Sequence, residues 1–441
     1  MKNELNYLIN QAKSASAEAC DVVGTRAQSL TLTTHREKRE KVERAESMEI
    51  GLRVLVGKRQ ASLSTTDLSR PALDALVERA LSMVKVMPED PYCGLAEPDQ
   101  LAKIIPDLAT YDDYEPTPDA LSDLAQAAES AALSVPGVTN TEGGHASWNA
   151  TEIYLLTSHG FEGHRKKSNF GIAASVIAQK DDSMEVSYDY TSAVFHSDLK
   201  SPQEIGESAG RKTVARLNPR KLKTGNYPIF FAPRMAATLL SHLVQGINGA
   251  NIANGTSFLK DKMGETLFNH AIQIIDDPLR ARGFASRAFD GEGLPTAKRA
   301  IIENGVLKTW LLNLRAARQL GLHSTGHAVR IGTTPPSIAP SNLYLESGLF
   351  SPAALYKETG PGVLITDLMG RGFNETTGDY SVGASGFWIE NGQIAYPVSE
   401  ITIAGNLLEM FKTLTPANDL AFEDATSAPT VRIETMTIAG V

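Results

Sequence analysis

Two periods of apolar and polar positions divide the first half of the chain into helices and strands. A spacing of three to four residues predicts a helix over residues 2–18 and later helices that begin at residues 69, 117 and 201. Ser201 and Glu204 form a capping-box sequence at the last of these. Partly alternating segments predict long antiparallel strands. These segments are residues 21–33, 40–46, 48–66, 138–157, 161–179 and 184–196.

The second half is predicted to consist of strands and loops around one amphipathic helix. This helix begins at Pro233, ends near Gly246 and leads into a loop of small and polar residues at 248–257. Two Asn-Gly pairs, at residues 304–305 and 391–392, predict hairpin turns. Weaker helical patterns cover residues 314–320 and 351–358, and strand candidates are residues 271–275, 299–303, 306–312, 363–368, 386–390 and 393–396.

The grouping of the strands favours an α+β fold, because strands and helices do not alternate as they do in a parallel sheet. A length of 441 residues exceeds one typical domain. The polar segment 218–225 breaks both periods and marks a boundary. We therefore predict two domains with antiparallel sheets flanked by helices. Residues 1–222 form an N-terminal α+β domain, and residues 223–441 form a domain that is mostly β with one central helix.

Composition and charge narrow the class of function. The net charge is −9 and neither half of the chain is strongly basic, which argues against a nucleic-acid partner. No run of about 18 apolar residues predicts a membrane span, and the first residues do not resemble a signal peptide. Cys20 and Cys93 form no CxxC pair, so we predict no disulfide framework and a reducing, cytoplasmic location.

The histidines are weak candidates for a metal or catalytic site. A zinc-peptidase helix would carry HExxH, and this sequence has none. His242, in the central helix, is interpreted as a packing residue. His323 and His327 are four residues apart, but Gly326 indicates a loop, so a hydrogen-bonded turn is preferred over a metal or catalytic site. Two of the strand histidines at positions 145, 159 and 164 could approach each other across a hairpin.

The richest glycine segment runs from Gly370 to Gly386. It matches neither a P-loop nor a dinucleotide fingerprint nor a GxSxG elbow. One interpretation is tight turns and close backbone approach between strands. The other is a strand edge that accepts an extended peptide by backbone pairing. For the second interpretation the candidate peptide-cavity residues are Gly370, Gly372, Gly378, Asp379, Tyr380 and Ser381.

The segment 369–406, which reads MGRGFNETTGDYSVGASGFWIENGQIAYPVSEITIAGN, resembles the signature of the PmbA/TldE family. Shorter stretches spread over the chain agree with this resemblance, at residues 61–69, 139–144, 217–221 and 324–327. The resemblance implies a shared fold with the sister protein TldD and pairing of the two in a heterodimeric metalloprotease. That complex is a cylinder around a peptide-accepting cavity, linked to microcin maturation, antitoxin degradation and modulation of DNA gyrase.

In TldD, the resemblance implies, the central helix carries HExxxH and a cysteine near the C-terminus adds a metal ligand. With the following glycine-rich loop set in register, Leu240 and Gln245 stand at the two histidine positions and Ser241 at the glutamate. Leucine cannot bind zinc, glutamine is a poor ligand and serine is no carboxylate base. No cysteine follows Cys93. The resemblance therefore implies no metal, cofactor or catalytic residue in this chain, and zinc in a TldD-like partner.

Our leading hypothesis is a supporting subunit that helps a TldD-like partner process unfolded peptides and is inactive as an isolated chain. An alternative is a homodimeric binding or modulator protein of the gyrase-modulator type, without a proteolytic role. A third hypothesis is an enzyme with an unrecognised site around His323 and His327.

Overall fold

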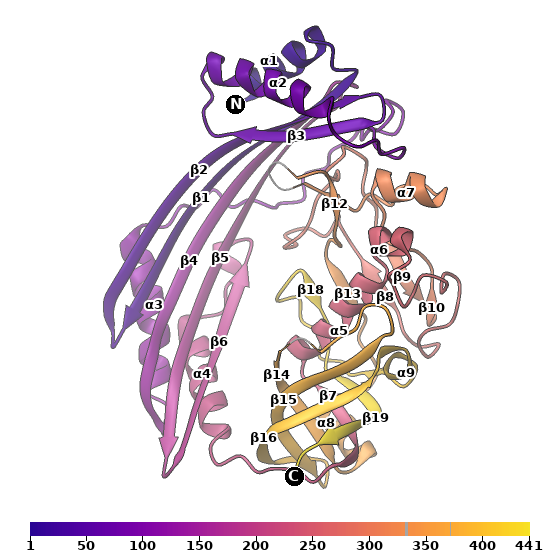
Figure 1. The fold of residues 1–441 in the computed structure, drawn as a ribbon. Helices are drawn as coiled ribbons and strands as arrows, with labels where there is room; N and C mark the ends of the chain where they lie inside the picture. The colour runs from indigo at the N-terminus through magenta and orange to yellow at the C-terminus, as the bar shows by residue number, and fades with distance from the viewer. Residues whose placement is uncertain (331–333, 371) are drawn as a thin grey trace.

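The N-terminal half is built on one long, curved, antiparallel sheet, shown in Figure 1. The computed structural model describes residues 1–330, 334–370 and 372–441. The strand order in this sheet is β3-β2-β1-β4-β5-β6, so β3 and β6 are its edges. Its strands are β1 (Ala19–His35), β2 (Lys38–Val56), β3 (Arg59–Thr65), β4 (Val138–Thr157), β5 (Glu162–Lys180) and β6 (Ser183–Ala193).

Helices cover this sheet at two places. Helices α1 (Lys2–Ser14) and α2 (Arg70–Val84) lie at one end, and α3 (Pro118–Leu133) and α4 (Pro202–Ala215) cover one face near the other end. The alternation along β4 fits this arrangement, because Trp148 is buried under α3. A short 3-10 helix, His196–Asp198, follows β6. The opposite face of the sheet is turned toward the C-terminal half (Figure 1).

Two expected boundaries and one expected helix cap differ in detail. The first helix ends at Ser14 rather than residue 18, since Ser16 has a φ of 78°. The predicted break between strands 40–46 and 48–66 is absent, because β2 runs without interruption from Lys38 to Val56, and β3 follows it after a hairpin turn. Ser69 occupies the N-cap of α2 but its side chain makes no capping bond. The capping box of Ser201 and Glu204 at α4 is confirmed.

The C-terminal half contains a second six-stranded sheet of order β16-β15-β14-β7-β19-β17. An additional pairing of β16 with β19 closes five of these strands into a small barrel. The strands are β7 (Gly225–Phe231), β14 (Gly362–Met369), β15 (Asp379–Glu390), β16 (Gln393–Asn406), β17 (Thr415–Pro416) and β19 (Val431–Ala439). The α+β prediction with antiparallel sheets is confirmed, although β7 pairs with β14 in parallel.

The central helix of the sequence is α5 (Pro233–Gly246), as predicted. Its apolar face lies in the largest hydrophobic core, together with side chains of the barrel. The predicted loop after it instead contains α6 (Gly249–Asn254), which Asn248 caps through its side chain. A second helix that the periodicity missed is α9 (Leu407–Lys412). Both are too short for two turns of apolar spacing, which explains why the sequence pattern overlooks them.

Short strands complete the C-terminal half. A small sheet of order β10-β9-β8-β13-β18 lies beside α5, and the Asn-Gly hairpins are confirmed. Asn304 and Gly305 have φ values of 50° and 78°, the positive values that a type I′ turn requires. The remaining elements are β8 (Ile274–Asp276), β9 (Arg299–Glu303), β10 (Val306–Leu307), β11 (Ala328–Val329), β12 (Ser337–Ile338), β13 (Leu343–Leu345), β18 (Thr426–Ser427), α7 (Leu314–Leu320) and α8 (Pro352–Thr359).

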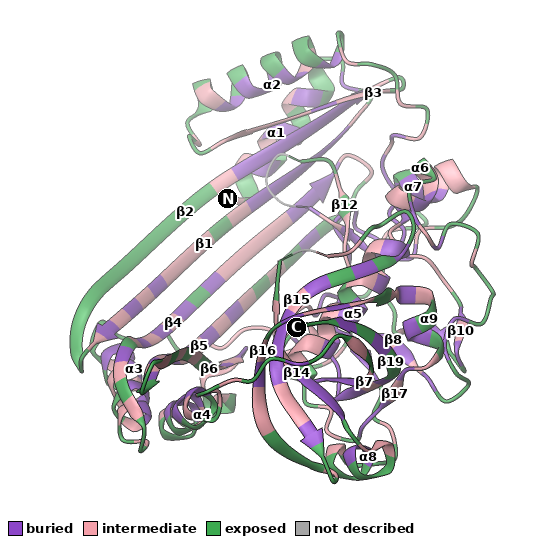
Figure 2. Ribbon diagram, turned by 60° about the horizontal axis from the view of Figure 1, so that its bottom comes forward, coloured by how far each residue is buried: buried purple, intermediate pink, exposed green. Residues whose placement is uncertain are grey.

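Burial follows this architecture, as Figure 2 shows, with exposed positions on the first part of β2, before its pairing with β3 begins, and on the helix surfaces. The predicted strand over residues 306–312 shortens to β10, because Leu311 pairs with Ile247 and Gly249 beside α5. Within the described residues, no helix is both long and apolar enough to cross a membrane. Cys20 and Cys93 are both buried and unpaired.

Candidate functional site

Leu240, Ser241 and Gln245 on α5, the positions that the family resemblance sets against a metal-binding motif, carry side chains that do not suit zinc. The Leu240 side chain is 3% exposed and belongs to the apolar core. Ser241 is exposed, and its hydroxyl donates a 3.2 Å hydrogen bond to the backbone oxygen of Ala237. Gln245 is half-buried at the end of the helix. A buried hydrocarbon, a hydroxyl bonded to its own helix and one amide do not fit a zinc ion.

His242 packs among aromatic side chains beside this stretch. Its ring centroid lies 4.7 Å from that of Phe373 and 5.7 Å from that of Tyr380. Burial lowers the pKa of His242, which favours the neutral ring. The side-chain Nδ1 of His242 and the hydroxyl of Tyr380 are buried without a hydrogen-bond partner. The packing interpretation of His242 agrees with these contacts.

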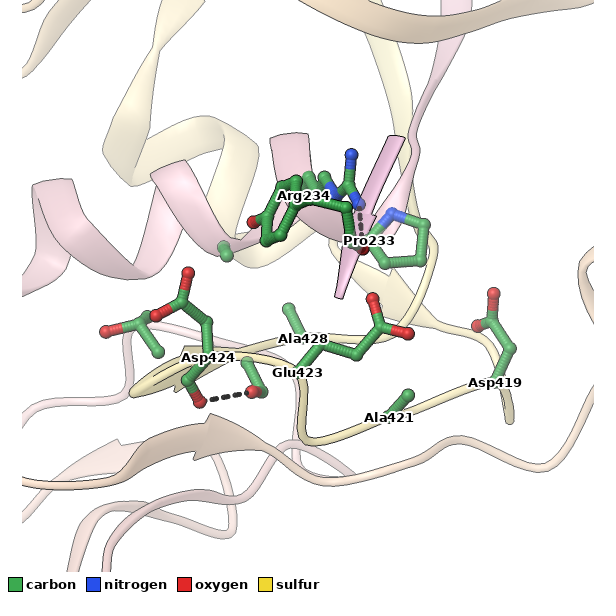
Figure 3. Close-up of a pocket in the computed structure, with 11 residues that line it drawn as sticks. Pro233, Arg234, Asp419, Ala421, Glu423, Asp424 and Ala428 are labelled. Carbon is green, nitrogen blue, oxygen red and sulfur yellow. Dashed lines mark hydrogen bonds between the residues drawn. The ribbon is translucent and has the colours of Figure 1, made fainter. Parts of the chain in front are cut away.

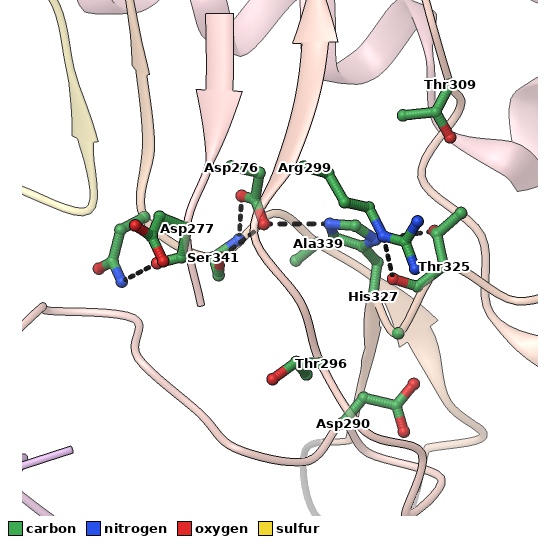
Figure 4. A network of polar contacts seen from close by, with 12 residues as sticks. Asp276, Asp277, Asp290, Thr296, Arg299, Thr309, Thr325, His327, Ala339 and Ser341 are labelled. Carbon is green, nitrogen blue, oxygen red and sulfur yellow. Dashed lines mark hydrogen bonds and ion pairs between the residues drawn. The ribbon is translucent and has the colours of Figure 1, made fainter. Parts of the chain in front are cut away.

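The structure separates His323 from His327. His323 is exposed, whereas His327 is 2% exposed within the polar network of Figure 4. The Nε2 atom of His327 lies 3.1 Å from the carboxylate of Asp276, and its Nδ1 lies 2.7 Å from the hydroxyl of Thr325. Burial would raise the pKa of Asp276, but hydrogen bonds from His327 and Ser341 lower it. This network ties three segments of the core together.

The strand histidines also have separate partners. His159 Nδ1 lies 2.7 Å from the backbone oxygen of Ala96, and His164 Nε2 lies 2.9 Å from Glu152. His145 is opposite Ala173 on the neighbouring strand. Across the described part of the chain, no three His, Cys, Asp or Glu side chains form a group suited to a metal ion.

The glycine-rich segment is an interior part of the barrel. Ser381 donates a 2.6 Å backbone hydrogen bond to Gly372, and β16 pairs with the other side of Asp379, Tyr380 and Ser381. From Gly383 onward β15 pairs with both β14 and β16. The strand-edge interpretation is therefore wrong for residues 379–386, since their backbone groups already have partners on both sides.

Close backbone approach explains the glycines in this segment. A Cβ atom on Gly372 would lie 1.4 Å from the Ser381 oxygen, and one on Gly386 would lie 1.8 Å from the Leu364 oxygen. Gly370 is exposed, Gly378 is buried with a φ of 79°, and Arg371 between them lies outside the described residues. The role of the six candidate peptide-cavity residues stays a prediction, and none of them lines either of the two cavities beside Arg234.

A cavity of about 600 Å³, which sequence reasoning missed, lies between the two halves of the chain. Its N-terminal side is the edge strand β6 and the helix α4, and its C-terminal side is the first turn of α5 and the end of β14. We call this cavity the interdomain slot. Its ionisable lining residues are Asp189, Lys200, Arg211, Lys212, Arg216, Arg234, Asp367 and Glu423.

Ion pairs across the interdomain slot join the halves. Asp189 on β6 accepts a 2.6 Å bond from Arg234 of α5 and pairs with Lys212 of α4 at 2.7 Å. Burial would raise the pKa of Asp189, but Lys212, Ser208 and Arg234 lower it. Arg216 at the end of α4 bonds to Asp367 on β14.

A second cavity, of about 320 Å³, adjoins the interdomain slot on the other side of Arg234. Figure 3 shows Arg234 across this cavity from the loop that carries Asp419, Glu423 and Asp424. Its charged lining is therefore mainly acidic, whereas basic side chains outnumber acidic ones in the interdomain slot. In the sequence, the interdomain slot is indicated only by one face of α4. Ser208, Arg211, Lys212 and Ala215 recur there at helical spacing.

Comparison with known proteins gives matches over nearly the whole chain. Three family models match in sequence: PmbA/TldA metallopeptidase domain 1 at residues 20–84, the central domain at 111–217 and the C-terminal domain at 224–440. The chain is 38% identical to the metalloprotease PmbA of Escherichia coli O157:H7, over 97% of this chain and 93% of that protein. It is 36% identical to a PmbA homolog of Haemophilus influenzae, over 100% of this chain and 96% of that protein.

Solved structures share the fold. A proposed modulator of DNA gyrase from Bacteroides thetaiotaomicron superposes with a TM-score of 0.91 at 26% identity, covering 100% of this chain and 99% of that one. TldE from Thermococcus kodakarensis has a TM-score of 0.89 at 22% identity, covering 99% of this chain and 100% of that one. At 22% identity, the similarity to TldE from Thermococcus kodakarensis shows a shared fold alone.

Proposed function

Because the chain belongs to the PmbA/TldE family of metallopeptidases, we propose that it is the non-metal-binding subunit of a two-subunit peptidase. A TldD-like chain supplies the zinc ion and the carboxylate base in this proposal. The present chain contributes part of the wall around the peptide. The substrates are unfolded peptides, of the kind processed in microcin maturation or antitoxin degradation, and the setting is cytoplasmic.

The observation that carries the proposal is the state of α5. Leu240 is part of the apolar core, and the Ser241 hydroxyl bonds to the backbone of its own helix. Of the three positions that the resemblance sets against two metal ligands and a base, only Gln245 therefore offers a polar group to a metal, and that group is an amide. Replacing any one of these residues would not restore a site. A family member with this helix needs a second chain for metal-dependent hydrolysis.

The test compares this chain, a TldD-like chain and the mixture of both. We expect zinc at about one equivalent in the purified mixture, none in this chain alone, and hydrolysis of an unfolded peptide only in the mixture. A chelator should abolish that hydrolysis. Stoichiometric zinc in this chain alone, or full activity of the TldD-like chain without it, would contradict the proposal.

A second candidate is a homodimeric modulator without a proteolytic role. It is favoured by the names of two relatives of known structure, from Bacteroides thetaiotaomicron and Thermotoga maritima, which are proposed modulators of DNA gyrase at 26% and 27% identity. Light scattering separates the two candidates. A stable dimer of this chain that does not exchange subunits with a TldD-like chain favours the modulator, and a mixed dimer favours the supporting subunit.

A further inference from the structure

The interdomain slot lies between two strand edges that have no partner strand there. One wall is the outer edge of β6 at Ser187, Tyr188 and Asp189. The other is the end of β14, where Thr366 and Asp367 follow the last residue that pairs with β7. The slot volume of about 600 Å³ falls within the range of about 300–1,000 Å³ typical of ligand sites.

On the outer edge of β6, the backbone groups of Val186 and Tyr188 are free to pair, whereas those of Tyr190 are already bonded. The Tyr190 N–H donates to the side chain of Asp189, and the Tyr190 oxygen accepts from Arg234, so both backbone groups point away from β5. Because peptide groups alternate along a strand without a bulge, those of Val186 and Tyr188 point the same way. Within the described residues neither makes a hydrogen bond on that side. An open edge of this kind is a template for strand addition.

The side chains beside this edge are apolar and accessible. Met184, Val186 and Tyr188 are 63%, 40% and 53% exposed, on the face of β6 opposite α4. Side chains of an added strand would alternate between this surface and the helix-covered side. The edge therefore offers both backbone pairing and apolar contact.

Charge selects among peptides. Five basic side chains line the interdomain slot against three acidic ones, and Glu185 and Glu207 pair with two of the five from outside this lining. Lys200 and Arg211 are 52% and 63% exposed at their side chains, and each has a single ion-pair partner, Glu423 and Glu207. The free N-terminal end of α5 adds positive potential at Pro233 and Arg234. An incoming carboxylate is favoured over an incoming cation.

We propose that the interdomain slot binds an extended acidic peptide segment as an added strand on β6, with its carboxylates facing Lys200 and Arg211. This inference rests on the proposed peptide-processing function and specifies its substrate class. It places peptide recognition on residues of this chain.

Binding is measured by fluorescence anisotropy on the isolated full-length chain with a labelled, unstructured acidic peptide. The comparison peptide has the same sequence with Asn and Gln in place of Asp and Glu. We expect at least tenfold tighter binding of the acidic peptide, weakened by salt. Equal affinity for both peptides would overturn the charge argument.

Two variants test the geometry. Val186→Pro removes an outward N–H without a loss of pairing to β5 and should weaken binding at least tenfold, whereas Val186→Thr retains the N–H and should bind normally. Arg211→Glu should weaken binding similarly, and Lys58→Glu, the same charge change on an exposed turn outside the slot, should not. Wild-type affinity in both Val186→Pro and Arg211→Glu would overturn the proposal.

A peptide-side variant keeps the test independent of folding. An acidic peptide with N-methyl groups at alternate residues cannot pair along one edge and should lose binding to the wild-type chain. Unchanged affinity would exclude strand addition. The binding measurement needs neither a metal nor a partner chain. Absence of peptidase activity in the two-subunit mixture and absence of peptide binding by this chain are therefore separate results.

Discussion

Asp189 on the edge strand β6 and Arg234 in the first turn of α5 form a 2.6 Å ion pair that joins the two halves of the chain. The same carboxylate pairs with Lys212 of α4 at 2.7 Å. One buried side chain thus holds the sheet, a covering helix and the central helix together. The ion pair of Arg216 with Asp367 joins the same two halves on the other wall of the interdomain slot.

Asp189→Asn should lower the free energy of unfolding by about 1–3 kcal/mol, because two cations lose a charged partner. The pKa of Asp189 is lowered in the fold, so its contribution is present above the ordinary Asp pKa of about 3.9 and is lost as pH falls through the folded value. Denaturant unfolding of the wild type and of Asp189→Asn at pH 7 and at pH 3 measures this difference in free energy. Asp198→Asn, which removes an exposed pair with Arg282, is the control and should cost below about 1 kcal/mol.

Glu129 of α3 secures the tip of the β1–β2 hairpin. Fully buried, it accepts hydrogen bonds from the Thr34 hydroxyl at 2.8 Å and from the Arg36 and Glu37 N–H groups at 2.7 and 3.0 Å. Glu129→Ala should destabilise the chain by about 3 kcal/mol, because three donors lose a charged acceptor. Glu409→Ala, on an exposed helix surface, should have little effect in the same unfolding experiment. Equally small losses of unfolding free energy in both variants would contradict the role of Glu129 at the hairpin tip.

Glu292 makes stability depend on pH in the opposite sense to Asp189. Burial, with the nearby charge of Asp290, raises the pKa of Glu292 from 4.5 to about 7. Between those values the folded chain retains a proton that the unfolded chain loses, so stability should fall as pH rises through this window, by up to about 1.4 kcal/mol per pH unit. Glu292→Gln should flatten the profile and be more stable than the wild type at pH 8. An unchanged pH profile would contradict this prediction.

The glycine-rich segment should respond to substitution according to backbone distance. Gly386→Ala would place a Cβ atom 1.8 Å from the Leu364 oxygen and should cost about 3 kcal/mol or more, because two paired strands must separate. Gly383→Ala, with its nearest contact at 3.2 Å, should cost about 1 kcal/mol. Similar losses at both positions would mean that conformational freedom, not close approach, explains these glycines.

The two histidines of the third hypothesis should behave differently. His327→Ala should lower the free energy of unfolding by about 3 kcal/mol, because Asp276 and Thr325 lose a buried partner. His323→Ala, at an exposed position, should stay within about 0.5 kcal/mol. Peptidase activity of the two-subunit mixture, per folded molecule, should be unchanged in both. Lost activity with retained stability would revive a catalytic role.

Local patterns predicted most of the N-terminal sheet because four of its five strand pairs join consecutive strands through short turns, and only β1 and β4 pair over a long separation. The hairpins at 304–305 and 391–392 follow from φ values that Asn and Gly tolerate. The same is true of the helix start at Ser201, where the cap is local. The short helices α6 and α9 escaped prediction because one turn carries no periodicity, although Asn248 and Asn406 cap them.

The sequence alone determined the family, the α+β class and the residues at the α5 motif, because these depend on identities and on contacts between near neighbours. Tertiary structure decided that the glycine-rich segment is an interior strand, since that requires β14 and β16 on its two sides. Tertiary structure also decided which residues meet to line the interdomain slot. Asp189 and Asp367 line it from positions 178 residues apart (367 − 189), and no local period reports a contact over such a separation.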